Sequence, residues 1–495
     1  MTTREIDYHF RVDWDFDGSY TDESLHLISA NGRLRLAAPA SSIASPKGIV
    51  DQMTVVLDNS EGRYSPMNSA GALYSSIQDG GAYHAPCYFE VSIDGGSNFY
   101  RTFTGVIKIP VEQGPTIRTT AIVSIDCRGR DETLLNNRVS TTQTRFQTAY
   151  ANYWNEAEII DQWLTDAGLS SGSDYVVDEG LFRVPWVWLD DESPIEEIWA
   201  LAAACGGRFY CDPDGVFRYE NAYHWLLSPH TVSQETITES NHAQIMPYYS
   251  DRDLYKSVTV ETSGRALAAI DTIWQAENVV TVAPNTTKTV TAKMRQPCYS
   301  VNAISYTAVT PGGVDLDSYI TVTATYYAQR IELSIENAHT EQQAMLIGLQ
   351  VTGIAVDGRP SQEETYDSDD TSYWNTSKRQ GRTRALRSNA WVQTRTQMEF
   401  LGTFLIDRWE NPILAYRLQG VPGDPQRRLG DRITIDDESV MSSSRDAYVT
   451  EITWRADGTG FVQDIIAYDA LNMFPSSSYF VLGTNQCGDT EVLFY

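Results

Sequence analysis

The sequence lacks most of the features that usually reveal a site or a cellular compartment. Its six cysteines are dispersed, and no two of them are separated by two residues, so the common zinc and redox spacings are absent. No run of about 18 apolar residues occurs, which excludes a membrane-spanning helix. The first ten residues contain no basic segment followed by an apolar one, and we expect no secretory signal.

Basic residues are also scarce. The 495-residue chain has 37 Lys and Arg against 65 Asp and Glu, a formal net charge of −28. Binding to nucleic acid phosphates needs clustered Lys and Arg, so specific nucleic acid binding is not expected. The hydrophobic fraction of 42% still provides for a core. The 28 Tyr and 12 Trp suit β-sheets and protein interfaces.

Alternating apolar and polar residues predict strands in the N-terminal part of the chain. The clearest are Met53–Leu57, Tyr88–Ile93, Phe99–Ile109 and Ala121–Cys127. An Asp-Gly pair joins the second and third of these, which indicates a hairpin because Asp-Gly supplies the positive φ of a tight turn. We interpret residues 1–130 as one barrel-like β domain.

Helical periodicity marks residues 131–225. Asn155 and Glu158 form a capping-box pattern that starts one helix, and Gly168 ends it. The other expected elements are a helix that opens on Ser193–Glu196 and the strands Arg208–Cys211 and Val216–Tyr219. This pattern predicts a small α+β insertion domain in which a helix packs on a hairpin.

Strands return after residue 226. Residues 226–384 form a predicted β-rich domain that ends in a polar loop, 361–384, without an apolar period. Residues 385–474 form a predicted helix plus β-barrel-like domain. The expected elements of these two regions are the strands Ser257–Glu261, Tyr319–Thr325 and Arg330–Glu336, a helix between Trp391 and Leu405, and the strands Arg432–Ile435, Tyr448–Trp454 and Phe461–Tyr468.

The last segment, residues 475–495, is a predicted docking tail. Pro475 and three serines end the preceding domain, and two apolar clusters follow, Tyr479–Leu482 and Val492–Tyr495. Such clusters would promote aggregation if they stayed exposed. We therefore expect the tail to pack either on its own domain or on a neighbouring subunit.

Candidate motifs for chemistry are few, and each fails a check. Asp13–Gly18 resembles the start of a calcium loop, but its twelfth position is Ser24 rather than Glu. Gly168–Gly172 matches the G-x-S-x-G motif of a nucleophile elbow, but it follows a predicted helix, whereas a true elbow follows a strand. The acids Asp190–Glu192 precede a helix start, where negative charge is favourable. The basic run Lys378–Arg387 is read as a solvated loop. We therefore assign no catalytic, cofactor-binding or metal residue.

Six segments, taken in order, resemble one family. They are Leu57–Asn68, Phe103–Ile107, Ile125–Leu135, Ala202–Tyr219, Leu349–Gly353 and Leu429–Ile433. In this order they are similar to the central hub of the tail tip or baseplate of long-tailed bacteriophages, a family of minor tail proteins. The resemblance extends over roughly residues 45–470, which is most of the chain, and residues 475–495 have no counterpart in it.

The resemblance implies a mainly β, multi-domain fold with two β-barrel-like domains and an α+β insertion. It implies a homotrimer that adapts the six-fold tail tube to a three-fold tip and lines the channel for DNA ejection. Implied partners are distal tail or tail tube proteins above, and a tip or fibre protein and a tape measure protein. DNA would pass without specific binding, and the strong negative charge suits such a duct because it repels phosphate. The implied location is the tail tip of the virion, built from protein made in the host cytoplasm.

Two other hypotheses stay open. A distal-tail ring or receptor-binding tip protein would form six copies rather than three, and rings of that kind lack the α+β insertion. An envelope-degrading enzyme would be revealed by zymography on host envelope. Because no active site is visible in the sequence, we expect no enzymatic activity.

Overall fold

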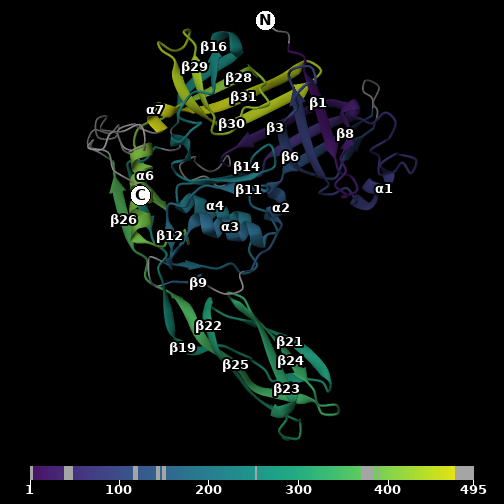
Figure 1. Ribbon diagram of the computed structural model, residues 1–495, viewed down its shortest axis with the longest axis vertical. Coiled ribbons are helices and arrows are strands. Elements are labelled where there is room, and N and C mark those ends of the chain that lie inside the picture. The colour runs from purple at the N-terminus through teal and green to yellow at the C-terminus, as the bar shows by residue number, and fades with distance from the viewer. Residues whose placement is uncertain are drawn as a thin grey trace.

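The computed structural model of the protein describes residues 4–37, 48–114, 121–140, 145–147, 152–250, 254–368, 383–386 and 389–473. These residues form many strands and few helices, so the expected mainly β class is confirmed. Figure 1 shows an upper body that contains the largest sheet and most of the helices, and a separate lobe of strands at the lower end. None of the described helices is long and apolar enough to cross a membrane. The predicted docking tail, 475–495, lies outside the described residues.

The largest sheet takes its 14 strands from both ends of the chain. From the N-terminal part come β1 (Asp7–Val12), β2 (Thr21–Asp22), β3 (Leu27–Arg35), β4 (Gln52–Asp58), β5 (Pro86–Ser92), β6 (Tyr100–Ile107), β7 (Val111–Gln113) and β8 (Ile122–Gly129). From the C-terminal part come β28 (Leu414–Pro422), β29 (Arg432–Asp436), β30 (Arg445–Asp457) and β31 (Gly460–Asp469), and β16 (Glu235–Thr238) and β17 (Gln244–Tyr249) join them from the middle of the chain. Strands with one buried face alternate buried and exposed residues, and this alternation allowed the sequence to predict seven of the fourteen, namely β4, β5, β6, β8, β29, β30 and β31.

The two sets meet where β3 pairs antiparallel with β30. The register runs from Ser29 opposite Asp457 to Arg35 opposite Glu451. The strand order is β17-β28-β31-β30-β3-β4-β8-β6-β5-β1-β2, with β16, β29 and β7 off this path. Within the described strands, β17 and β2 at the ends of this order are not paired with each other. No closed barrel is therefore found there, and the two expected barrel-like regions share a single sheet.

Packing across this meeting point is tight. Trp454 of β30 is 1% exposed, and its ring stacks on Phe89 of β5 with a centroid distance of 5.2 Å and an interplanar angle of 18°. Gly32 of β3 lies against the same indole, and a Cβ at position 32 would stand 2.4 Å from the ring. The close approach therefore requires glycine at this position. The two ends of the chain consequently share one hydrophobic core.

The α+β unit has the elements that the sequence predicted. Its helices are α2 (Asp131–Leu135), α3 (Glu156–Asp166) and α4 (Pro194–Ala204), and its strands are β9 (Arg145–Phe146), β10 (Trp154–Asn155), β11 (Tyr175–Val177), β12 (Arg183–Val184), β13 (Trp186–Val187), β14 (Arg208–Cys211) and β15 (Phe217–Glu220). Both halves of the capping box at Asn155 and Glu158 are present. The Ser193 hydroxyl, by contrast, donates to the Leu134 carbonyl (3.4 Å) and does not cap α4.

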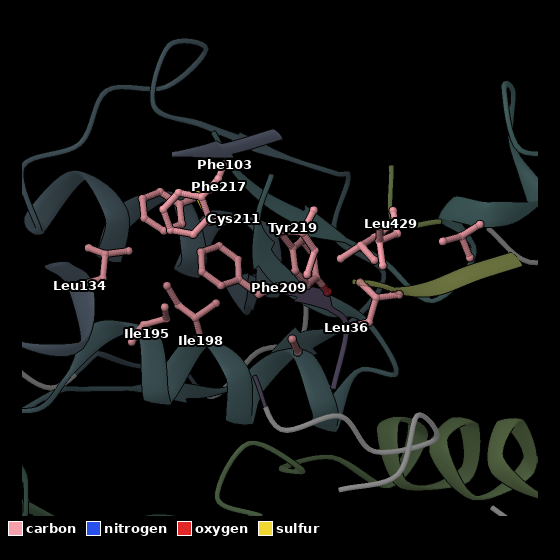
Figure 2. Packing of buried hydrophobic residues seen from close by; sticks show 14 of the residues in the cluster. Leu36, Phe103, Leu134, Ile195, Ile198, Phe209, Cys211, Phe217, Tyr219 and Leu429 are labelled. Carbon is pink, nitrogen blue, oxygen red and sulfur yellow. The ribbon is translucent and has the colours of Figure 1, made fainter. Parts of the chain in front are cut away.

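The core of this unit is continuous with that of the main sheet. Figure 2 shows Ile195 and Ile198 on α4 beneath the rings of Phe209 and Phe217 on the hairpin. On the far side of Tyr219, Leu36 and Leu429 extend the same buried cluster towards the main sheet. The unit is thereby fixed against the sheet by apolar packing.

The lower lobe is formed by two small sheets within the stretch 226–384. One contains β19 (Arg265–Gln275), β20 (Val280–Val282), β22 (Cys298–Val309) and β25 (Ala344–Gly358), and the other contains β21 (Thr286–Lys293), β23 (Ile320–Tyr326) and β24 (Arg330–Asn337). They enclose a core of their own, which includes Leu333, Ile335 and Leu346. The domain boundaries drawn from the sequence remain predictions.

A third small sheet connects the lobe to the body. It contains β18 (Ser257–Glu261), β26 (Glu363–Asp367) and β27 (Thr383–Leu386), and it packs on α6 (Arg395–Trp409). The predicted polar loop over 361–384 is therefore wrong at its start, where β26 pairs with β18, and at its last two residues, which belong to β27 and also pair with β18. Pairing and the contact of Tyr366 with Gly402 of α6 order this polar segment. Residues 369–382 of the same prediction lie outside the described residues. The remaining short helices are α1 (Tyr74–Ile77) and α7 (Ala470–Met473).

Candidate functional site

The acidic segment Asp13–Gly18 forms a turn held by its first residue. The Asp13 carboxylate accepts the main-chain N–H groups of Asp17 (3.1 Å) and Gly18 (3.0 Å). Both carboxylate oxygens of Asp13 therefore accept hydrogen bonds from the main chain of the turn itself. Among the described residues no group of three or more His, Cys, Asp or Glu side chains is arranged to hold a metal ion.

The other sequence candidates lie beside helix ends. Gly168 (φ 88°) and Gly172 (φ 82°) flank the loop after α3, and the Ser170 N–H donates to Asp174 (2.9 Å). Glu192 comes just before α4; burial, followed by the charges of Glu197 and Asp190, raises its pKa to about 7. Of the basic run 378–387, only the main chain of residues 383–386 is described.

The segment Leu57–Asn68 forms a turn that closes on a buried carboxylate. Gly62 has φ +66°; the Asn59 side chain accepts the Tyr64 N–H, and the Asn68 amide donates to the Gly62 carbonyl. The carboxylate is that of Glu23, which is 0% exposed. Its donors are Trp14 Nε1 (2.9 Å), Arg63 Nε (3.0 Å), Arg63 Nη2 (2.8 Å) and the Tyr64 hydroxyl (2.6 Å). This turn thus anchors the end of β4 to the segment before β3.

A cavity lies where the α+β unit meets the main sheet; we call it the junction cavity. Its volume is ≈ 320 Å³. Its walls come from Asp178, the hairpin Tyr210–Glu220, the segment 224–230 and the turn Arg428–Asp431. Both acidic and basic side chains therefore face the same space.

A histidine pair forms one wall of the junction cavity. His224 Nδ1 is 2.8 Å from Asp178 Oδ2, and its Nε2 is 3.6 Å from Glu220 Oε1. Burial opposes protonation of His224, but the hydrogen bond to Asp178 and the charge of Glu220 outweigh it, so its pKa is raised. His230, with its ring centroid 5.1 Å away, has a pKa lowered mainly by burial.

Behind this wall a buried network joins the α+β unit to β30. Glu220 accepts hydrogen bonds from the Tyr210 hydroxyl (2.6 Å) and from Trp225 Nε1 (3.1 Å). The Arg208 guanidinium, in a residue only 4% exposed, lies 3.8 Å from the centroid of the Trp225 ring. Trp225 in turn stacks on Tyr448 of β30 at a centroid distance of 5.0 Å, and the Tyr448 hydroxyl donates to the Trp225 carbonyl (3.1 Å).

The described lining of the junction cavity offers hydrogen-bonding and charged groups but no activated nucleophile. The described lining residues include no Ser or Thr hydroxyl beside the His224–Asp178 pair. The one thiol, Cys211, is buried, and burial raises its pKa well above the ordinary value, so it is a poor nucleophile. A histidine–carboxylate pair without an activated nucleophile does not complete an acyl-transfer site.

Sequence reasoning missed the residues of the junction cavity. Asp178, Glu220, His224 and His230 are separated by irregular intervals, and no known motif links them. They meet because the hairpin β14–β15 brings its strand ends against the main sheet. The only local signal was the hairpin itself.

Two buried carboxyl groups lie on the sheet side of the same hairpin. Burial raises the pKa of Asp131 to about 7, although the main-chain N–H groups of Asp131 and Cys211 oppose the shift. Burial, followed by the neighbouring Asp131 carboxyl, also raises the pKa of Asp51. Both groups therefore stay neutral to a higher pH in the folded protein than in the unfolded chain.

This pair predicts a pH dependence of stability. Because the folded pKa of Asp131 is raised from 3.8 to about 7, its stabilising contribution is complete below about pH 4 and is lost as the pH rises through about 7. From pH 5 to pH 8 we expect this group alone to lower the free energy of unfolding by roughly 2–3 kcal/mol. In urea denaturation measured at several pH values, Asp131→Asn should make the slope shallower, while the raised pKa of Asp51 leaves a slope of its own.

The control for this experiment is Glu239→Gln, a change at an exposed carboxylate. Its stability profile should run parallel to that of the unmodified protein. If the stability profile of Asp131→Asn also runs parallel to that of the unmodified protein, the pKa of Asp131 is not raised in the folded state and the prediction is wrong.

Comparison with known proteins returns structural neighbours only. No family model matches the sequence, and no curated protein matches it. A tail protein from Neisseria meningitidis is similar over 94% of this chain and 98% of its own, with 10% identity and a TM-score of 0.49. A prophage tail protein from Shewanella oneidensis covers the same shares, with 10% identity and a TM-score of 0.48.

A third neighbour is a component of the E. coli type VI secretion system, described as structurally similar to two tail proteins of bacteriophage T4. It is similar over 90% of this chain and 73% of its own, with 9% identity and a TM-score of 0.38. All three TM-scores lie below 0.5, so these similarities do not assign a function to this chain, and any proposal has to rest on its own residues.

Proposed function

We propose that this chain is the subunit of a trimeric tail-tip hub of a long-tailed bacteriophage. The observation that carries the proposal is the main sheet, built from both ends of the chain and joined at β3 and β30. A three-fold assembly can present six sheet regions to a six-fold tube only if each subunit supplies two. Here the N-terminal and C-terminal strands supply one region each, and their shared core holds them in a fixed relation.

The six segments of the sequence resemblance support the same proposal. Leu57–Asn68 is the turn closed on Glu23, and Ala202–Tyr219 contains the end of α4 and the hairpin β14–β15. Leu429–Ile433 lines the junction cavity and enters β29. The resemblance therefore falls on segments that hold the architecture together, as a structural protein requires.

In the proposed assembly the hub would lie between distal tail or tail tube proteins and a tip or fibre protein, with the tape measure protein and then DNA in its channel. Three subunits would carry a formal net charge of −84 (3 × −28). A channel lined by such subunits would repel phosphate and let DNA pass without retention. We propose no enzymatic role.

The assembly state tests this proposal directly. Native mass spectrometry of the purified 55.4 kDa chain, followed by electron microscopy of isolated tails, should show three copies around the axis. Six copies would favour the distal-tail ring, and one copy in intact tails would contradict a hub. Zymography on host envelope addresses the enzyme: turnover that a single carboxylate substitution abolishes would overturn the structural role.

A further inference from the structure

A second cavity lies at the base of the lower lobe; we call it the hinge cavity. Its volume is ≈ 630 Å³. The lobe contributes the start of β19, Arg265–Leu267, and the body contributes Trp186 and the segment Gln393–Arg395. The two connections between lobe and body run beside it. They are held together by hydrogen bonds from Arg359 N–H to the Gly264 carbonyl (2.9 Å) and from Thr262 N–H to the Gln362 carbonyl (2.8 Å). A ligand bound there would touch both parts.

The hinge cavity is basic although the chain is acidic. Arg265, Arg359 and Arg395 line it, and none of the described lining residues is Asp or Glu. The chain as a whole has 65 acidic residues and 37 basic ones, so a carboxylate-free wall is unusual for it. The junction cavity, in contrast, contains acidic and basic side chains together. The remaining polar lining includes Gln147 and Gln362, whose amide groups can donate to an anion.

Two of the three arginines, Arg265 and Arg359, form no salt bridge with a described carboxylate, although the charge of Asp357 acts on Arg265. The Arg265 guanidinium lies 5.4 Å and 5.2 Å from the ring centroids of Trp186 and Trp188, which stack on each other at 4.6 Å. Such contacts hold the planar group through its face and leave its N–H donors in the plane available. Arg359 is exposed and forms no salt bridge with a described residue. Arg395 is partly neutralised by Glu399 at 2.7 Å.

The start of α6 adds to the positive potential of this cavity. Thr394 is the N-cap of this 15-residue helix and accepts the Gln397 N–H (3.2 Å), so the positive end of the helix dipole lies at the cavity wall. Gln393 bonds both the N–H and the carbonyl of Trp186 (3.2 and 3.0 Å), which fixes the wall between helix and indole. The Trp186 indole N–H is buried and has no hydrogen-bond partner among the described residues.

We propose that the hinge cavity binds an oxyanion, a carboxylate or phosphate group, between Arg265 and Arg359 at the start of α6, and that the bound anion couples the lobe to the body. The ligand chemistry follows from the donors, which are guanidinium groups, side-chain amides and a helix N-terminus, and from the lack of Asp and Glu among the described lining residues. The anion can come from free phosphate or from an acidic polypeptide. The proposal is independent of the tail-tip role.

The test compares two probes on the full chain at constant ionic strength. Inorganic phosphate and a hexaglutamate peptide are titrated by calorimetry into the unmodified protein, into Arg265→Gln/Arg359→Gln, and into the control Arg455→Gln. Arg455 is an exposed arginine paired with Asp457 on the main sheet. We expect saturable binding that weakens at least tenfold in the double variant and stays unchanged in the control. Hydrogen exchange should slow at residues 262–267 and 359–362 when the probe is bound.

The outcomes show whether the hinge cavity binds an oxyanion at all and, if it does, whether free phosphate or an acidic polypeptide supplies it. Binding of phosphate alone assigns a free anion, and binding of the peptide alone assigns an acidic polypeptide; both support the site. If neither probe binds, or if the double variant retains the binding, the proposal is overturned. If the double variant does not fold, Arg359→Gln alone decides, because this side chain is exposed and its loss should weaken binding without unfolding the protein.

Discussion

Replacing Glu23 with alanine should lower the free energy of unfolding by roughly 3–5 kcal/mol. The carboxylate is fully buried and accepts four hydrogen bonds, two from Arg63 and one each from Trp14 and Tyr64. Its removal leaves a guanidinium, an indole N–H and a hydroxyl without their acceptor in a site with little access to water. Urea denaturation followed by tryptophan fluorescence measures the change.

A matched control is Arg455→Ala, which removes an exposed partner of Asp457. Exposed pairs contribute at most about 1 kcal/mol, so this variant should be nearly as stable as the unmodified protein. Glu23→Gln keeps the shape but not the charge and should be intermediate. A loss below about 1 kcal/mol for Glu23→Ala would contradict the role given to this carboxylate.

Trp454→Ala should cost roughly 3–5 kcal/mol as well, because it empties a buried site that neighbouring groups cannot refill. The ring stacks on Phe89 and covers Gly32, so it fills the space between the C-terminal strand β30 and the N-terminal strands β3 and β5. Chemical denaturation should show the loss as a lower midpoint. Hydrogen exchange should accelerate in β3, β5 and β31 together, since these strands share the core.

Leu25→Ala serves as the control, because Leu25 is 98% exposed and its truncation should change stability by no more than about 0.5 kcal/mol. Faster exchange confined to the C-terminal strands of Trp454→Ala would mean that the two ends of the chain fold independently. That result would also remove the observation on which the hub proposal rests.

Local patterns in the sequence were sufficient for the elements that local chemistry determines. The capping box at Asn155 and Glu158 and the hairpin β14–β15 were both found from a few adjacent residues. Alternation identified β4, β8 and β31, because each of these strands has one buried face. These signals depend on neighbours in sequence and survive in any tertiary context.

Pairings between distant residues could not be predicted in the same way. No periodicity links β3 with β30, and β19 alternates poorly because much of it is exposed and its pairing with β25 has two register shifts. The polar strand β26 is ordered by β18 and α6, neither of which is adjacent in sequence. The two cavities are likewise lined by segments that only the fold brings together.

The pairing of β3 with β30 also has a consequence for the order of events during translation. Ser29 and its partner Asp457 are 428 positions apart (457 − 29). At roughly 5–20 residues per second, a ribosome needs on the order of 20–90 s to make the chain between them. During that interval one edge of β3 has no native partner, and Gly32 lacks the indole that covers it. An open edge of this kind pairs readily with other nascent chains. High-level expression should therefore yield aggregates that form before synthesis ends, and less frequent initiation, which lowers the number of nascent chains present together, should increase the soluble fraction.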